Sequence, residues 1–187
     1  MIQTTRAMSA LTGICAGERT SVRDWYLTKD GDESCLAMYE RHYSAYKYAD
    51  GRARELFAGP GDKIVLRTRE ADAFFVWRRF IDDSGQTGIN CAAFRNEAPH
   101  KFTSSELVRQ ADSIAFHVWA DRRHYTYVDP KAVGSGNPGF CFKAAGWRFC
   151  GTTKRGLHIL EMVGPMTSTP LPQSPTTAAT TSSSLET

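Results

Sequence analysis

Several common signatures are missing from this 187-residue sequence, and each absence excludes a class of protein. It contains no run of about 18 apolar residues, so no helix is expected to cross a membrane. Its start lacks the uninterrupted apolar stretch of a signal peptide, and we therefore expect a cytoplasmic protein. Its five cysteines are widely spaced with no C-x-x-C pair, which disfavours a zinc ribbon and favours reduced thiols. A net charge of +3 permits a nucleic-acid partner without indicating one.

Large apolar residues are also scarce at the C-terminal end. The sequence after Met166 consists mainly of Thr, Ser, Pro and Ala, which cannot bury enough surface to offset the entropy of ordering. The remaining length suits one domain. We therefore expect a weakly patterned arm over 1–33, a single globular domain over 34–164 and a disordered tail over 165–187. The arm is open to two interpretations, a flexible segment or an added strand.

Hydrophobic periodicity predicts both helices and strands within the domain. A partial apolar stripe predicts a helix or helix-to-loop segment over 34–48. Alternating apolar residues between turn signals then predict an antiparallel meander, with its aromatic-rich middle strand at the centre of the sheet. Thr103 and Glu106 fit a capping box at the start of a long helix. The predicted meander strands span 63–68, 73–80 and 88–95.

The segment 124–161 carries the most specific pattern. A strand with alternating tyrosines ends at Asp129, and Asn137 followed by proline suits the N-cap of a short helix. Two β-rich runs, 147–153 and 157–163, then flank a Lys-Arg-Gly turn and predict a hairpin. This succession resembles the last third of the GNAT acyltransferase fold. The residues that match the family's helix motif are Asn137, Phe140, Phe142, Gly146 and Trp147.

The GNAT resemblance implies a fold class and a cofactor. The implied fold is a single α/β domain with a central mixed, mostly antiparallel sheet flanked by helices. The implied cofactor is acyl-CoA, whose pantetheine arm would lie along the short helix; the alternative is a structural βαββ end that binds nothing. The segment FRNEAPHKFTSSE contains no glycine, whereas the family's pyrophosphate loop is glycine-rich. We therefore expect an acyl donor other than ordinary acetyl-CoA.

A second resemblance is narrower. A His-Tyr-Ser sequence at residue 42, the FRNE strand end, a Ser-Ser-Glu helix start and the run NPGFCFKAAGW are similar to phage-encoded Mom-like DNA-modification enzymes. In that divergent GNAT-fold family, which counters restriction, a carbamoylmethyl group is added to the exocyclic nitrogen of adenine, and iron has been associated with the type enzyme. The resemblance implies action on a base flipped out of double-stranded DNA, in the cytoplasm of a bacterial host.

Four candidate catalytic residues match positions of that family. His42 is a candidate general base or iron ligand, because an imidazole titrates near neutrality. Tyr43 is a candidate proton donor or second iron ligand. Asp129 is placed to orient or deprotonate an amine, and Ser104 or its neighbour Ser105 begins the long helix. Each has a structural alternative, namely a surface hydrogen bond for His42, packing for Tyr43, turn formation for Asp129 and capping for the serines.

Further polar, aromatic and basic residues are candidates for binding. The donor-site or substrate-site candidates are Asn96, Glu97, Ser105, Asn137, Phe140 and Lys143. The candidates for stacking on a flipped base, with core packing as the alternative, are Trp77, Phe94, Tyr125 and Tyr127. Scattered arginines, including the pairs 78–79 and 122–123, suggest contacts with DNA phosphates, although solvated surface positions explain each one singly.

Three functions are compatible with these features. The first is a phage-type transferase that adds a small acyl-like group to a base amine in DNA, with adenine N6 as the favoured target. The second is an acetyl-CoA-dependent N-acetyltransferase acting on a small amine or an aminomethylated pyrimidine. The third is an inactive GNAT-like binding module. The glycine-free loop favours the first over the second, and nothing in the sequence indicates the oligomeric state.

Overall fold

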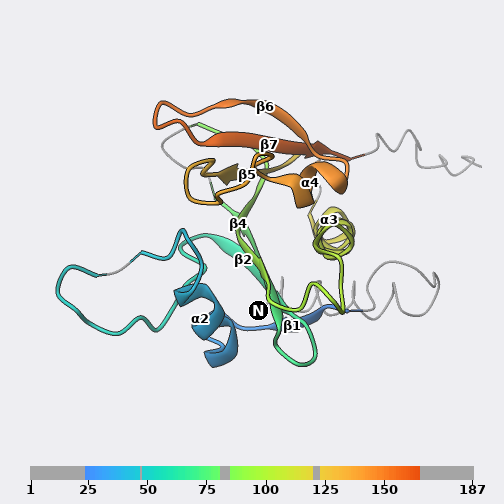
Figure 1. The fold of residues 1–187 in the computed structure, drawn as a ribbon. Helices are drawn as coiled ribbons and strands as arrows, with labels where there is room; N and C mark the ends of the chain where they lie inside the picture. The colour runs from blue at the N-terminus through green and yellow to red at the C-terminus, as the bar shows by residue number, and fades with distance from the viewer. Residues whose placement is uncertain (1–23, 47, 81–84, 120–122, 165–187) are drawn as a thin grey trace, which may run out of the picture.

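The computed structural model describes residues 24–46, 48–80, 85–119 and 123–164, so the predicted tail and most of the predicted arm lie outside the described residues. These residues form one seven-stranded sheet in the order β1-β2-β3-β4-β5-β7-β6 (Figure 1). Neighbouring strands are antiparallel except β4 and β5, which are parallel. The mixed, mostly antiparallel sheet of the sequence prediction is confirmed. The strands are β1 (Tyr26–Thr28), β2 (Asp62–Arg67), β3 (Ala73–Arg79), β4 (Ile89–Asn96), β5 (Arg123–Val128), β6 (Arg148–Thr152) and β7 (His158–Val163).

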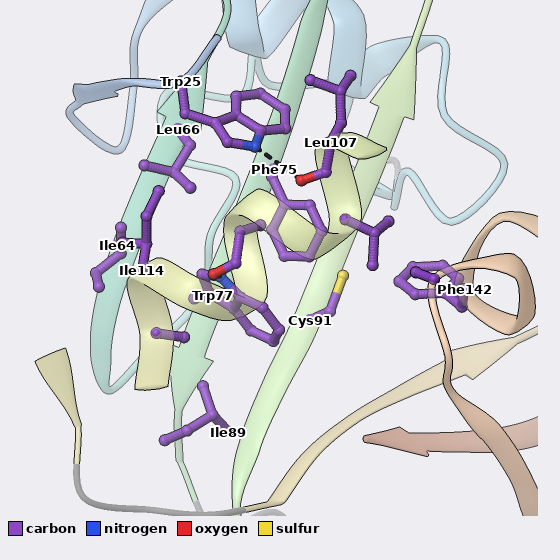
Figure 2. Packing of buried hydrophobic residues seen from close by; sticks show 14 of the residues in the cluster. Trp25, Ile64, Leu66, Phe75, Trp77, Ile89, Cys91, Leu107, Ile114 and Phe142 are labelled. Atoms are coloured by element: carbon purple, nitrogen blue, oxygen red, sulfur yellow. Dashed lines mark hydrogen bonds between the residues drawn. The ribbon is translucent and has the colours of Figure 1, made fainter. Parts of the chain in front are cut away.

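One face of the sheet packs against the long helix α3 (Ser104–Val118). The side of the helix that carries Leu107 and Ala111 is fully buried, as its 3.6-residue periodicity predicts. Two indole groups bond to the helix backbone: Trp25 Nε1 donates to the Leu107 carbonyl at 2.8 Å, and Trp77 Nε1 donates to the Ala111 carbonyl at 3.0 Å. Figure 2 shows this core, with Trp25 above Phe75 and the helix crossing the strands.

The opposite face is covered by α2 (Glu33–Glu40) and by the segment 41–61 that follows it (Figure 1). Met38 of the helix and Phe57 of the segment pack on Phe74 and Val76 of β3. The two faces of β3 therefore contribute to two separate apolar clusters, one under each layer. None of the helices in the described part of the chain is long and apolar enough to cross a membrane.

A buried polar network ties α3 to the second half of the sheet. The carboxylate of Asp112 lies 2.7 Å from Nδ1 of His124, on β5, and accepts a hydrogen bond from Nε1 of Trp147 at 2.8 Å. His124 is completely buried and stacks on Phe116 with 3.8 Å between ring centroids. Asp112 therefore serves as the acceptor for two ring N–H groups in the core.

The N-terminal part of the sheet begins before the predicted domain boundary at residue 34. β1 pairs with β2, so the added-strand interpretation describes 26–28. Trp25, only 3% exposed, belongs to the main core. The predicted meander is present as β2, β3 and β4. Its middle strand β3 was expected at the centre of the sheet, but in the seven-strand order the central strand is β4 and β3 lies next to it.

Of the two interpretations given for 34–48, the helix-to-loop segment describes the chain, because α2 ends at Glu40 and the chain then turns toward β5. The starts of the other two helices differ from the sequence prediction. The short helix α4 (Phe140–Ala144) begins after Gly139, whose φ of 74° lies in the left-handed region that favours glycine, rather than at Asn137. At α3, Thr103 is the N-cap residue but makes no side-chain cap bond, so the predicted capping box is not formed.

β4 and β5 separate part-way along their lengths. They are in register only from Ile89 and His124 to Cys91 and Thr126. Beyond that point β4 continues to Asn96 and β5 continues to Val128 without further pairing between them. The backbone edges of the two strands consequently face each other across a gap.

Candidate functional site

A cleft of about 1180 Å³ opens where β4 and β5 separate. Residues 92–94 of β4, together with the end of β5 and Asp129 directly after it, line the middle of the cleft. One wall comes from the chain around the start of α4, and the other comes from the segment 41–61 and the adjoining strands. Arg155, in the turn of the β6–β7 hairpin, completes the rim. The hairpin turn and the 41–61 segment project toward the same side of the sheet (Figure 1).

Tyr43 lies at the gap between the two strands. Its hydroxyl donates a long hydrogen bond, 3.5 Å, to the carbonyl of Tyr127 and accepts one from the backbone of Asp129. Burial against the sheet raises the pKa of Tyr43 to about 12, although 44% of the residue remains exposed. The phenol therefore keeps its proton at neutral pH and can donate to an atom that gains negative charge in the cleft.

His42 lines the same cleft, but its ring is already engaged. Nδ1 lies 2.7 Å from Ser44 Oγ and accepts the Ser44 backbone N–H at 3.2 Å, while the ring also bonds to the backbone of Phe94. Burial, reinforced by the positive charge of Arg95, lowers the pKa of His42 to about 4. A neutral ring held by these bonds is a poor general base at pH 7. The bonds of the His42 ring to Ser44 and Phe94 instead fix the turn that positions Tyr43.

Asp129 follows β5 and lines the cleft beside Tyr43. Its Oδ1 accepts the backbone N–H groups of Lys131 at 2.9 Å and Ala132 at 3.3 Å, so the turn predicted as its structural alternative does form. No hydrogen bond to its second oxygen is found within the described ranges. One oxygen thus fixes the carboxylate while the other is available to an amine in the cleft.

Asn137 and Phe140 line the cleft on the side of α4. Phe140 is 64% exposed, which is high for an aromatic ring and leaves one face of it available to a ligand. Lys143 does not line the cleft itself, but its Nζ donates to Asn137 Oδ1 at 2.6 Å and so orients that amide. Phe142 is buried and packs against Trp147.

Asn96, Ser104 and Ser105 lie away from the cleft, contrary to the sequence prediction. Asn96 Nδ2 donates to the Phe102 carbonyl at 2.9 Å and to Ser104 Oγ at 3.2 Å, and its Oδ1 accepts the Ala98 N–H. These bonds hold the glycine-free loop between β4 and α3. Ser105 occupies the first turn of α3.

Glu97 is likewise outside the cleft, where it forms ion pairs rather than a binding site. It contacts Arg41 at 2.7 Å and Arg95 at 2.6 Å. The hydrogen bonds from Arg41, followed by those from Arg95, lower the pKa of Glu97 to about 2. The residue therefore links the end of α2 to the end of β4.

Aromatic and cationic side chains gather on the α2 side of the cleft. The guanidinium of Arg54 lies 5.2 Å from the ring centroid of Tyr39 and 5.0 Å from that of Tyr48, and it donates to the carbonyl of Tyr46. Such stacking places positive charge over aromatic faces. These side chains all line the cleft, which gives this wall the composition of a surface that binds planar, negatively charged molecules.

The four predicted stacking residues divide between cleft and core. Phe94 and Tyr127 line the cleft. Trp77 is fully buried under α3, and Tyr125 is 1% exposed, so neither is available to stack on a ligand.

The residues present do not fit the iron site that the Mom-like resemblance implies. His42 already uses its ring in hydrogen bonds, and Tyr43 retains its phenolic proton. Across the described ranges, no cluster of three or more His, Cys, Asp or Glu side chains is arranged to hold a metal ion. We therefore derive no step through iron.

The strand order, the single parallel pair in the centre of the described sheet and the separation of β4 from β5 define a GNAT fold. Among solved structures, the GNAT domain of S. lividans PAT is similar, with a TM-score of 0.51 and 19% sequence identity over 74% of this chain and 89% of that domain. No family model and no curated protein matches the sequence. At this level of identity the likeness shows the fold alone.

Sequence reasoning missed the part of the cleft built by the segment 41–61 and by β3. Arg54 and Arg78 appeared only among scattered basic residues, and Tyr39 only as part of a helical stripe. The strong turn signal around Gly59 was visible, but no local pattern indicates that this turn folds back over the end of β3.

Proposed function

We propose that this protein transfers a small acyl-like group to an exocyclic amine of a DNA base, with adenine N6 as the favoured acceptor. One observation carries the proposal. A single cleft combines the gap between β4 and β5, the side chains of Tyr43 and Asp129, and an aromatic, cationic wall. The first feature suits an extended donor, the second suits proton transfer, and the third suits a nucleotide.

The donor side of the cleft fits the amide-bearing arm of an acyl-CoA or a related acyl donor. β4 and β5 do not pair with each other beyond Cys91 and Thr126, so the backbone of β4 at 92–93 can hydrogen-bond an extended ligand as a strand would. Asn137 and the exposed ring of Phe140 would hold the arm from the α4 side. When bound, such a donor supplies an activated carbonyl or an equivalent electrophilic carbon.

Two side chains of the protein would take part in proton transfer and hydrogen bonding during the reaction. The available oxygen of Asp129 would orient the acceptor amine and take its proton as the new bond forms. As the C–N bond forms, the bond between the transferred group and its carrier would break, and the carrier would leave with the electron pair. The protonated hydroxyl of Tyr43 would donate a hydrogen bond to the atom that gains this negative charge. His42 would act as a positioning residue, because its bonds to Ser44 and to Phe94 fix the turn before Tyr43.

The acceptor side supports a nucleotide rather than a small uncharged amine. Stacking on aromatic side chains and guanidinium groups is how proteins hold exposed bases, and Tyr48 and Arg54 offer such a surface. A base in double-stranded DNA must be flipped out before its exocyclic nitrogen becomes accessible. The proposal therefore includes duplex DNA as partner and a flipped base in the cleft.

Mass spectrometry of nucleosides from cells that express the protein tests this proposal. We expect a new deoxyadenosine adduct with the wild type and with the surface control Glu70→Gln, whose side chain is 66% exposed. Asp129→Asn should reduce the adduct about a hundredfold or more, the usual effect of losing a general base. Tyr43→Phe should reduce it as well.

Unchanged nucleosides with the wild type would contradict a DNA base as acceptor. Acetyl-CoA assays with small amines and aminomethylated pyrimidines would then test N-acetylation, and failure of every transfer assay would leave the inactive binding module. An adduct that persists at full level in Asp129→Asn would keep DNA as the substrate but remove Asp129 from the chemistry.

A further inference from the structure

Most charged groups in the cleft have partners within the protein. Lys63 contacts Asp30 at 3.1 Å and the Gly59 carbonyl at 2.5 Å, and Arg54 donates to a backbone carbonyl. Asp30 also accepts the backbone N–H groups of Phe57 and Ala58. These charges are therefore largely satisfied before any ligand binds.

Arg78 is different, because its guanidinium has no anionic or carbonyl partner within the described part of the chain. Its Nε is buried and makes no hydrogen bond, and the contact found for the group is with the ring of Phe80, 5.4 Å away. A buried polar atom without a partner is unfavourable, and more so when it is charged. Such a group calls for a partner beyond the described residues, which a bound anion can supply.

The position of Arg78 directs it to the acceptor side of the cleft. It alternates with Phe74 and Val76, which pack under α2, so it lies on the α2 face of β3 and lines the cleft. It is in register with Asn90, one residue before Cys91, where β4 and β5 begin to separate. Neighbouring strands lie about 5 Å apart and successive residues of a strand about 3 Å apart, so the backbone of Arg78 is one strand away from β4 and one residue before Cys91. One ligand can therefore contact both.

The turn at Gly59 keeps space for this guanidinium. A Cβ atom at Gly59 would lie 2.7 Å from Nη1 of Arg78, and the φ of 79° favours glycine there. The fold thus brings two distant segments together around an arginine whose charge no other described residue neutralises.

We propose that the Arg78 guanidinium binds a phosphate group of the acceptor. The planar fork of an arginine matches the oxygens of a phosphate, and a ligand anion would supply the missing partner. The nucleotide part of this inference rests on the proposed function, in which phosphate is the anionic group of the acceptor. The anion contact itself does not depend on which base is modified.

Calorimetric titration of the full chain with three probes tests the contact. The probes are deoxyadenosine 5′-monophosphate, deoxyadenosine and inorganic phosphate, at one fixed low salt concentration because phosphate contacts weaken with salt. We expect the wild type to bind the monophosphate about ten- to a hundredfold more tightly than the nucleoside, the worth of a charge-assisted hydrogen bond. Arg78→Gln should remove that difference and leave the affinity for deoxyadenosine unchanged.

Two further variants sharpen the result. Arg79→Gln is the matched control, because it removes the same charge from the next residue of β3, which is exposed and does not line the cleft. It should bind all three probes as the wild type does. Arg78→Lys should recover part of the preference for the monophosphate, since it restores the charge without the fork.

The possible outcomes separate this inference from the proposed function. Equal affinities of the wild type for nucleoside and monophosphate, or a monophosphate affinity unchanged in Arg78→Gln, would overturn the phosphate contact. So would the absence of any Arg78-dependent binding of phosphate or monophosphate. If phosphate binding depends on Arg78 but the monophosphate binds no more tightly than inorganic phosphate, the contact stands and the nucleobase acceptor fails.

Discussion

Replacing Asp112 with alanine should cost the protein a large part of its stability. The substitution removes the acceptor of both the His124 and the Trp147 ring N–H groups, at 2.7 Å and 2.8 Å, in a part of the core where His124 is completely buried. Each buried donor left without a partner costs about 1–3 kcal/mol, so the sum is about 2–6 kcal/mol. Rotating the imidazole offers no relief, because His124 Nε2 also lacks a partner.

Asp112→Asn gives a matched comparison of nearly the same shape. Its amide oxygen can accept from Trp147, and its amide N–H can donate to Nδ1 of a neutral His124 in the other tautomer. That tautomer places a proton on Nε2, which has no partner, so we expect a cost of about 1–3 kcal/mol, the penalty of one unpaired buried donor rather than the two of the alanine variant. Urea unfolding followed by tryptophan fluorescence measures both differences. An alanine variant within about 1 kcal/mol of wild type, or an asparagine variant as unstable as the alanine one, would refute the reasoning.

Three other changes have predictable results. Glu97→Gln should lower the free energy of unfolding by about 1 kcal/mol at pH 7, after allowance for solvent screening of a side chain that is 28% exposed. Because folding lowers the pKa of Glu97 to about 2, this stabilisation is present above its ordinary pKa of 4.5 and is lost as the pH falls toward 2, so the two unfolding curves should converge there. Gly88→Ala should lower the melting temperature of the protein, because its φ of 112° disfavours a side chain and the new Cβ would clash with the backbone oxygen of Arg123; an unchanged melting temperature would contradict this clash at the start of β4 and β5. Trp25→Phe should destabilise by about 1–3 kcal/mol through loss of its bond to the helix backbone, and urea unfolding with no change in midpoint would contradict the role given to that bond.

The parts of the fold that local patterns specify were predictable. The meander follows from alternation between turn signals, and the buried side of α3 follows from helical periodicity. Trp25 was missed because its burial depends on a backbone carbonyl 82 residues away. The choice between a helix and a helix-to-loop segment over 34–48 stayed open for a comparable reason, since the apolar stripe continues past Glu40 while contacts from distant strands redirect the chain.

The candidate site was predictable only in part. Tyr43, Asp129, Asn137 and Phe140 meet in one cleft, which a family pattern could indicate because it records residues that the fold brings together. Glu97 looked like a binding residue because a charge at a strand end is ambiguous in sequence. Its two arginine partners, one of them 56 residues earlier in the chain, decide its structural role.

The three-residue register between β4 and β5 also bears on how this protein tolerates mutation. Recognition at the gap would rest on main-chain amides, which are the same whatever side chains the strands carry. A substitution in this part of β4 can therefore leave the main-chain contacts with an extended ligand intact, provided that the side-chain contacts of Phe94, Arg95 and Asn96 keep the strand in place. In proteins descended from this chain, the shape of the gap would therefore be retained longer than its amino-acid sequence.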